Sequence, residues 1–292
     1  MSEIAHEIAS QPSAWAEAVA RARGATDLLP PKGARVAVVG CGTSLFMSQA
    51  YAVLRELAGH GETDAFPASE MPSGRTYETV LAISRSGTTT EVLRLLEALP
   101  ASVPAVAVSA VADSPIVRTA ERAIVLEFAD ERSVVQTRFA TSVLALLRAC
   151  LGEDLAPVIA DGERALEADL PIRTEAFDHL VFLGRGWTVG LANEAALKVR
   201  EASGVFSESY PAMEYRHGPI SVADERSLVW ALGDVGADLL EDVGATGATV
   251  VAGELDPMAE LVKIQRTAVL LAEAKGLDPD RPRHLTRSVV LS

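Results

Sequence analysis

The sequence predicts an α/β protein made of two similar halves, each with a parallel β-sheet flanked by helices. Short apolar runs alternate with helix-like stretches, which is typical of parallel strands joined by helical crossovers. Apolar residues make up 49% of the 292 residues and aromatic residues only 5%, a composition typical of helix-covered sheets. The pattern also restarts, because VAVVGCGTS at 36–44 and LVFLGRGWT at 180–188 each place Gly-x-Gly after an apolar run, 144 residues apart.

The first half is expected to span residues 1–160. Its first helix should end before Pro30-Pro31, because a proline disfavours helical geometry in the residue that precedes it. Short apolar runs indicate strands, and the longer amphipathic stretches between them indicate helices. The expected elements are helices at 12–29, 45–59, 89–98 and 134–151, and strands at 35–39, 78–83, 104–110 and 122–128.

The second half is expected to span residues 161–292, after an acidic, helix-like stretch around 155–170. The expected elements are strands at 180–183, 226–232 and 247–252, and helices at 189–203 and 257–275. The stretch 207–221 is interpreted as irregular, because Pro211 and Gly218-Pro219 interrupt it. The alternative to two halves is one large doubly wound sheet.

Composition excludes several classes of function. The net charge of −14 argues against nucleic acids and anionic membrane surfaces as partners, since both attract basic patches. The sequence has no uncharged apolar run of 18 residues and no signal-peptide pattern, and its two cysteines make no disulfide framework. We therefore expect a cytoplasmic protein. The five histidines and two cysteines show no metal-type spacing, so no metal is expected.

Two hydroxyl-rich loops follow expected strands, GCGTS at 40–44 and SRSGTTT at 84–90. Each leads into a helix, whose free N–H groups and dipole favour an anion. Serine and threonine hydroxyls donate to phosphate oxygens, and Gly87 lets the backbone approach closely. Ligands bind at the carboxyl ends of strands in open α/β sheets. The two loops are therefore predicted to hold a phosphate ester.

Other interpretations of these loops explain less. Helix capping accounts for one or two hydroxyls but not for the five between 84 and 90. A P-loop is excluded, because no Gly-Lys-Ser/Thr is present. A dinucleotide site would need a third glycine where Leu45 stands, so a nicotinamide enzyme is only an alternative. Cys41 lacks the partners of a nucleophile and is interpreted as a packing residue.

The helix predicted at 189–203 carries the candidate chemistry. Glu194, Lys198 and Glu201 recur at i, i+4 and i+7 and so share one face. A surface Glu–Lys pair is the alternative interpretation. The helix follows Gly184-x-Gly186, which favours a position beside a cleft. His217 lies in the irregular stretch that follows, framed by glycine and proline, where a functional histidine is plausible.

Eight stretches, in order along nearly the whole chain, resemble the double sugar isomerase (SIS) domain family. The similarity is greatest to the isomerase half of glucosamine-6-phosphate synthase and to stand-alone phosphosugar isomerases, deaminases and deglycases. The resemblance implies two flavodoxin-like three-layer sandwiches. The matching stretches are EIASQP (7–12), GCGTS (40–44), SRSGTTT (84–90), SVVQTRF (133–139), LGRG (183–186), NEAALKVREAS (193–203), EYRHGP (214–219) and DRPRHLTRSVVLS (280–292).

The resemblance also implies a role for each matching residue. Glu201 would be the enolisation base, Lys198 a charge-stabilising lysine, Glu194 a supporting acid, and His217 a ring-opening histidine from the partner subunit of a homodimer. Two positions depart from the family: Arg85 replaces a glutamine, and Arg287 replaces a tail lysine and cannot readily lose its proton. The implied substrate-binding residues are Gly42, Thr43, Ser44, Ser84, Arg85, Ser86, Thr89, Gln136 and Arg287.

These features lead to one expected function and one alternative. The expected function is aldose–ketose isomerisation, or removal of an amine from an amino-sugar phosphate, by proton transfer through an enediol or enolamine. The substrates would belong to the fructose 6-phosphate and glucosamine 6-phosphate class, and no cofactor would be needed. The alternative is a non-catalytic regulatory protein that binds a sugar phosphate.

Overall fold

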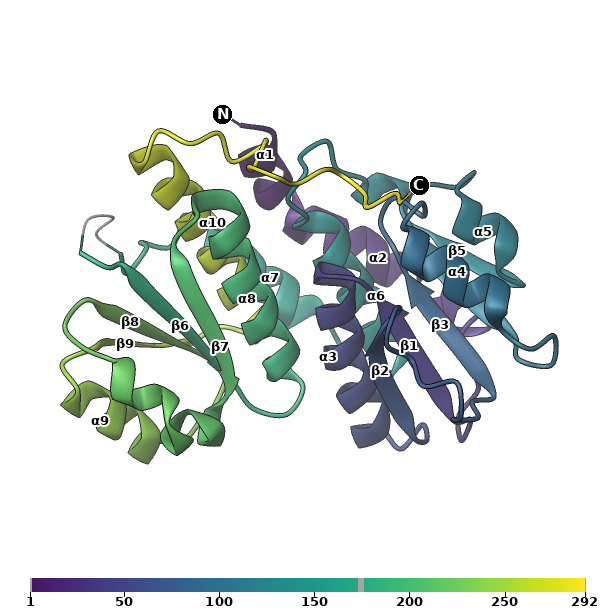
Figure 1. Ribbon diagram of the computed structural model, residues 1–292, viewed down its shortest axis with the longest axis horizontal. Coiled ribbons are helices and arrows are strands. Elements are labelled where there is room, and N and C mark those ends of the chain that lie inside the picture. The colour runs from purple at the N-terminus through teal and green to yellow at the C-terminus, as the bar shows by residue number, and fades with distance from the viewer. Residues whose placement is uncertain (1, 173–175, 292) are drawn as a thin grey trace. The chain divides into compact units, whose positions relative to one another are not determined.

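The computed structural model (Figure 1) describes residues 2–172 and 176–291, so the last residue of the tail motif, Ser292, lies outside the described part. Contacts divide the chain into two compact units that are not continuous in sequence. The N-terminal unit contains Ser13–Arg132, Arg138–Leu155 and the tail from Thr286 onward. The C-terminal unit contains the chain up to Pro12, Ser133–Thr137 and Ala156–Leu285.

The N-terminal unit has a parallel five-stranded sheet with the order β2-β1-β3-β4-β5. Its three central strands are buried along their whole length, because helices cover both faces. The strands are β1 (Val36–Gly40), β2 (Thr63–Pro67), β3 (Thr79–Ile83), β4 (Ala105–Ser109) and β5 (Arg122–Val125). The helices are α2 (Gln11–Thr26), α3 (Thr43–Leu57), α4 (Thr90–Ala98), α5 (Pro115–Thr119) and α6 (Arg138–Cys150), with a 3-10 turn, η1 (Glu127–Ala129).

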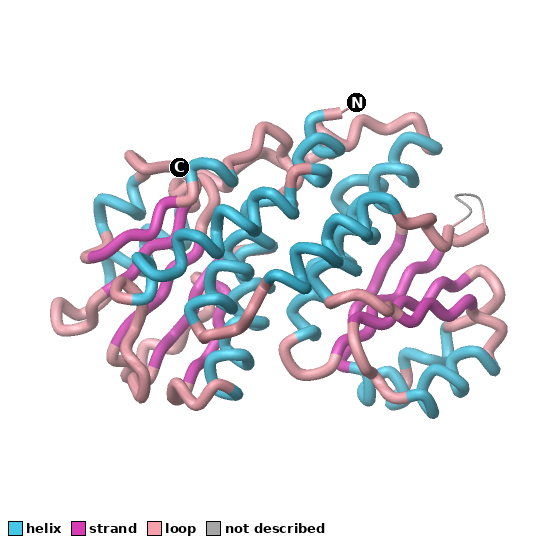
Figure 2. The backbone as a smooth tube through the Cα atoms, turned by 180° about the vertical axis from the view of Figure 1, so that it is seen from behind, coloured by secondary structure: helices cyan, strands magenta, loops and turns pink. Residues whose placement is uncertain are grey.

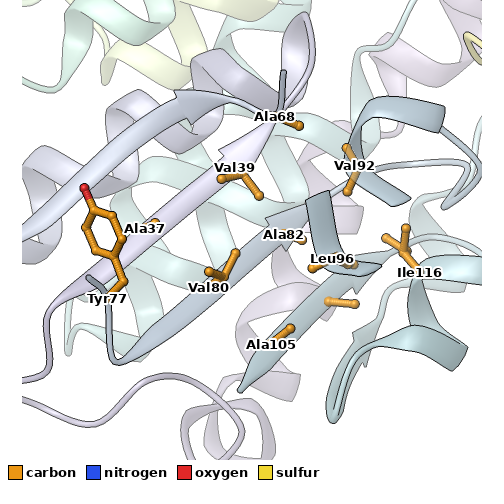
Figure 3. Packing of buried hydrophobic residues seen from close by; sticks show 11 residues of the cluster. Ala37, Val39, Ala68, Tyr77, Val80, Ala82, Val92, Leu96, Ala105 and Ile116 are labelled. Carbon is orange, nitrogen blue, oxygen red and sulfur yellow. The ribbon is translucent and has the colours of Figure 1, made fainter. Parts of the chain in front are cut away.

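Strand side chains of this sheet alternate between two cores. Val39 and Ala82 face α4 and α5, where they pack with Val92, Leu96 and Ile116 (Figure 3). The alternate side chains point the other way, toward the face on which α3 packs against β1 and α6. The strand ends are thereby held rigidly between two helical layers.

The C-terminal unit has a parallel four-stranded sheet with the order β7-β6-β8-β9. Figure 2 shows its strands with helices on either side. The strands are β6 (His179–Gly184), β7 (Phe206–Pro211), β8 (Ser227–Leu232) and β9 (Thr249–Ala252). The helices are α1 (Glu3–Ala9), α7 (Ala156–Glu167), α8 (Thr188–Ser203), α9 (Ala237–Ala245) and α10 (Pro257–Ala274), with 3-10 turns η2 (Ala212–His217) and η3 (Pro219–Val222).

The two parallel sheets confirm the predicted α/β class, and the alternative of one large sheet is wrong. The interpretation of 207–221 as irregular is also wrong in its first part, because this stretch begins with β7. Strand β2 has the same edge position in the first sheet as β7 has in the second, and it was not expected from the sequence either. Both are edge strands that end in proline, and Gly40 pairs with Pro67 as Gly184 pairs with Pro211. Their partly polar sequences carry no strong strand signal.

Both Gly-x-Gly loops have the same local geometry. A Cβ atom on Gly40 would lie 2.7 Å from the Ser44 carbonyl carbon, and one on Gly184 would lie 2.4 Å from the Thr188 carbonyl oxygen. The second glycine of each loop has a positive φ, 54° and 58°. The first glycine therefore lets the following helix start against the strand end, and the second makes the turn.

No helix in the described ranges is long and apolar enough to cross a membrane.

We expect Gly184→Ala to lower the free energy of unfolding by about 2–3 kcal/mol, because its methyl group would overlap backbone atoms that cannot move freely. Urea denaturation measures this change. Gly244→Ala in α9 is the control, since no atom apart from the adjoining backbone of its own helix lies within 4 Å of the position that its methyl group would take. Equal unfolding midpoints for the two variants would contradict the close approach at Gly184.

Candidate active site

The hydroxyl loop, residues 84–90, connects β3 to α4 and is braced by its own side chains. Ser84 Oγ accepts a hydrogen bond from the Gly87 N–H at 3.2 Å and lies 3.3 Å from Thr89 Oγ1. Ser86 Oγ accepts two hydrogen bonds from Thr88, one from its backbone N–H at 3.2 Å and one from the Thr88 hydroxyl at 3.0 Å. Gly87 has φ 64°, and any Cβ there would overlap the Ser114 side chain. The loop is thus a built turn with its hydroxyls gathered together.

The second predicted loop emerges beside the first, because β1 and β3 are neighbours in the sheet. Thr43 and Ser44 begin α3 and are almost completely buried. Gly42 precedes them and provides no side-chain cap. The two loops therefore lie at the same edge of one sheet, as the sequence predicted.

Arg85 is fixed inside the protein rather than exposed on the loop. Its side chain is 1% exposed and lies 3.7 Å from the buried Glu131 carboxylate. Glu131 in turn accepts the backbone N–H groups of Arg138 and Phe139 at the start of α6. Arg85 therefore holds a buried positive charge in the loop and, through Glu131, links the loop to the start of α6.

The C-terminal tail contacts the hydroxyl loop. The Ser288 hydroxyl lies 3.1 Å from Ser86 Oγ and 2.9 Å from Thr88 Oγ1. Arg85 donates from Nη2 to the Arg287 carbonyl at 3.1 Å. The Arg287 guanidinium forms an ion pair with Asp130. The structure thus places Arg287 and the tail beside the predicted phosphate loop.

Gln136 lies in the short 133–137 segment of the C-terminal unit. Its buried Oε1 atom has no hydrogen-bond partner among the described residues. A buried acceptor without a partner is unusual, and a ligand hydroxyl would satisfy it. This observation fits the predicted contact with a sugar.

The three charged residues of α8 form a buried cluster. Lys198 Nζ lies 2.5 Å from Glu201 Oε2 and 3.4 Å from Glu194 Oε1. The Lys198 side chain is 2% exposed and that of Glu194 0%, whereas Glu201 is 20% exposed. The shared face was predicted correctly, and the alternative of a surface pair is wrong. Glu201 alone reaches solvent, and buried charges hold it in place.

A cavity of about 500 Å³ opens beside Glu201. Its walls come from the end of α8 and from residues 277–285, and they include Arg281, Arg283 and His284. Three arginines of the lining, Arg200, Arg281 and Arg283, outnumber its two carboxylates, Glu201 and Asp278, which suits an anionic ligand. His284 has φ 64°, the one positive φ outside glycine in the described chain. The only sequence signal for these residues was the motif DRPRHLTRSVVLS.

Glu201 and His217 lie at opposite ends of the sheet of the C-terminal unit. Helix α8 starts at Thr188, just beyond the carboxyl end of β6 at Gly184, and returns to the amino end of β7. Glu201 is in its last turn, about 20 Å along the helix axis from its start. His217 follows the carboxyl end of β7 at Pro211. Glu201 is therefore far from the Gly184-x-Gly186 loop, although that loop was the reason for expecting the helix to lie beside a cleft.

The two residues also belong to opposite faces of this sheet. Ser207 donates to the Ala196 carbonyl of α8 at 2.8 Å, and Ser207 pairs with Leu180 in the sheet. Leu180 and α8 thus share one face. Tyr215 of η2 packs against Val181 on the other face. Within one chain, the sheet separates the elements that carry Glu201 and His217.

Comparisons with known proteins show what the chain is similar to. No family model matches the chain. It is 28% identical to the glutamine–fructose-6-phosphate aminotransferase [isomerizing] of Methanothermobacter thermautotrophicus, over 88% of this chain and 52% of that protein. The chain thus spans about half the length of the curated relatives it matches, and its homologues there are the isomerase (SIS) domains.

Solved structures share the fold across the whole chain. A glucosamine-6-phosphate deaminase from Thermotoga maritima has a TM-score of 0.86 and 24% identity, covering 99% of this chain and 100% of its own. The C-terminal domain of the glucosamine-fructose-6-phosphate aminotransferase from Francisella tularensis has a TM-score of 0.83 and 22% identity, covering 97% and 98%.

We expect Lys198→Met to lower the free energy of unfolding by about 3 kcal/mol near neutral pH, because it leaves buried carboxylates without their cation. Chemical denaturation followed by circular dichroism tests this. Arg226→Ala is the control, since its ion pair with Asp178 is exposed and its loss should be within experimental error. Unchanged stability of the lysine variant would show that Lys198 does not compensate the buried acids.

Proposed function

We propose that this chain, whose homologues are the isomerase (SIS) domains of glutamine–fructose-6-phosphate aminotransferases, transfers a proton between adjacent carbons of a phosphorylated sugar. The reaction is an aldose–ketose isomerisation or the release of an amine from an amino-sugar phosphate. The observation that carries this proposal is the Glu201 carboxylate, which borders a cavity of about 500 Å³ whose wall includes three arginines. That volume lies in the range of small-molecule sites.

Glu201 is the proposed base. It would take the proton from the carbon next to the carbonyl or imine and return it to the neighbouring carbon, through an enediol or enolamine. Lys198 Nζ, 2.5 Å from Glu201 Oε2, supplies positive charge where an oxyanion develops. Glu194, buried beside Lys198, keeps the lysine in place. None of these steps uses a cofactor.

The hydroxyl loop is the proposed phosphate site. Ser84, Ser86 and Thr89 bring three hydroxyls to one turn, and Arg85 adds a buried positive charge. Hydrogen bonds to an anion are roughly twice as strong as those between neutral groups. Binding energy from the phosphate then orients carbons that lie away from it.

His217 is proposed to open the sugar ring of the other subunit in a homodimer. Its side chain is exposed, and the sheet separates it from Glu201 of the same chain. A histidine exchanges protons near neutral pH, as ring opening requires. In a homodimer, His217 of one copy would approach Glu201 of the other, so the sheet would not lie between the two side chains.

We expect Glu201→Gln to lower kcat about 10³-fold, because a positioned general base contributes 10²–10⁴-fold, and to leave substrate affinity nearly unchanged. The assay follows fructose 6-phosphate, glucosamine 6-phosphate and a fructosamine 6-phosphate with purified full-length protein. Glu241→Gln, on the exposed side of α9, is the matched control and should keep full activity. Binding of these sugars without turnover by the unmodified protein would instead indicate a regulatory role.

A further inference from the structure

Three hydroxyl groups meet at the phosphate loop, and one of them comes from the far end of the chain. Ser86 and Thr88 lie 3.0 Å apart, and Ser288 lies 3.1 Å and 2.9 Å from them. Each hydroxyl has a single proton to donate. Ser86 and Thr88 both point their donors at the Ser288 oxygen, and Thr88 also reaches Ser86, so Ser288 accepts in this group and none of these bonds uses its own proton.

The tail is fixed on both sides of Ser288. Before it, the Arg287 carbonyl accepts from Arg85 at 3.1 Å. After it, the Val289 carbonyl accepts from the Thr90 N–H at 3.1 Å, and the Leu291 N–H donates to Thr90 Oγ1 at 2.8 Å. All these partners belong to the hydroxyl loop. The position of the Ser288 hydroxyl is therefore set by the loop.

The anchor of this arrangement is itself rigid. Arg85 is 1% exposed and lies 3.7 Å from the carboxylate of Glu131, which is 0% exposed. The tail carbonyl thus binds a guanidinium that cannot swing out toward solvent. A second contact, between the Arg287 side chain and Asp130, holds the same stretch of tail.

We propose that Ser288 is a substrate-binding residue whose hydroxyl donates to the sugar phosphate together with Ser86 and Thr88. This inference rests on the proposed phosphate site. Turning the O–H bonds of Ser86 and Thr88 outward replaces neutral hydrogen bonds with charge-assisted ones, which are stronger. The Ser288 proton adds a further charge-assisted bond, and the oxygens need not move. Binding of the phosphate and docking of the tail then stabilise each other.

Affinity for fructose 6-phosphate, measured by titration calorimetry on the full chain, tests this role. Ser288→Ala should weaken binding about tenfold, the effect of one hydrogen bond to a charged group. Ser288→Thr should restore most of the affinity, since it keeps the hydroxyl. Val290→Ala is the matched tail control, because that side chain is 69% exposed, and it should bind as the unmodified protein does.

Trypsin cleavage after Arg287 gives an independent readout. Saturating fructose 6-phosphate should slow this cleavage in the unmodified protein and not in Ser288→Ala. Unchanged or tighter binding by Ser288→Ala, or faster cleavage with ligand, would show that the phosphate displaces the tail. Either result would overturn the role of Ser288 but not the proposed phosphate site. An unmodified protein that binds neither this sugar nor inorganic phosphate would overturn the proposed phosphate site as well.

Discussion

The sheet of the C-terminal unit separates the proposed base from the proposed ring-opening histidine of the same chain. Glu201 sits in the last turn of α8 on one face, and His217 ends η2 on the other face. A packed parallel sheet is a solid layer, with Val181 and Leu180 filling its two sides at 0% exposure. For this reason the proposed use of both side chains on one sugar includes a second copy of the chain.

Burial determines which carboxylate of the α8 cluster is accessible. Lys198 and Glu194 are enclosed, so their charges must be paired to remain buried. Glu201 shares the same lysine but keeps part of its surface open beside the cavity. The buried charges of Lys198 and Glu194 thus hold the one accessible carboxylate of the cluster, that of Glu201, in position. This arrangement suits a proton-transfer site better than a surface ion pair, which would be mobile and weakly held.

The sequence predicts the central strands well, because strands covered on both faces must be apolar throughout. VAVV of β1 and LAI of β3 are completely buried, and such short apolar runs next to glycine and polar residues are typical of buried strands. The edge strands β2 and β7 are only partly buried along most of their length. Their mixed polarity does not distinguish them from loops.

The candidate site was predictable where it is local and not where it depends on folding. The spacing of Glu194, Lys198 and Glu201 already places them on one helix face. No local pattern indicates that Ser288 meets Ser86, a residue 202 positions earlier in the chain. The cavity-lining residues Arg281, Arg283 and His284 were likewise recognisable only as part of a family motif.

Activity of mixed dimers tests most directly whether two chains share each site. Glu201→Gln and His217→Ala variants, each nearly inactive alone, are unfolded together, refolded and assayed for phosphosugar turnover. If the sites are shared, half of the dimers are mixed and each regains one native site, so activity should reach about a quarter of the unmodified level. Activity that stays at the level of the separate variants would contradict the account.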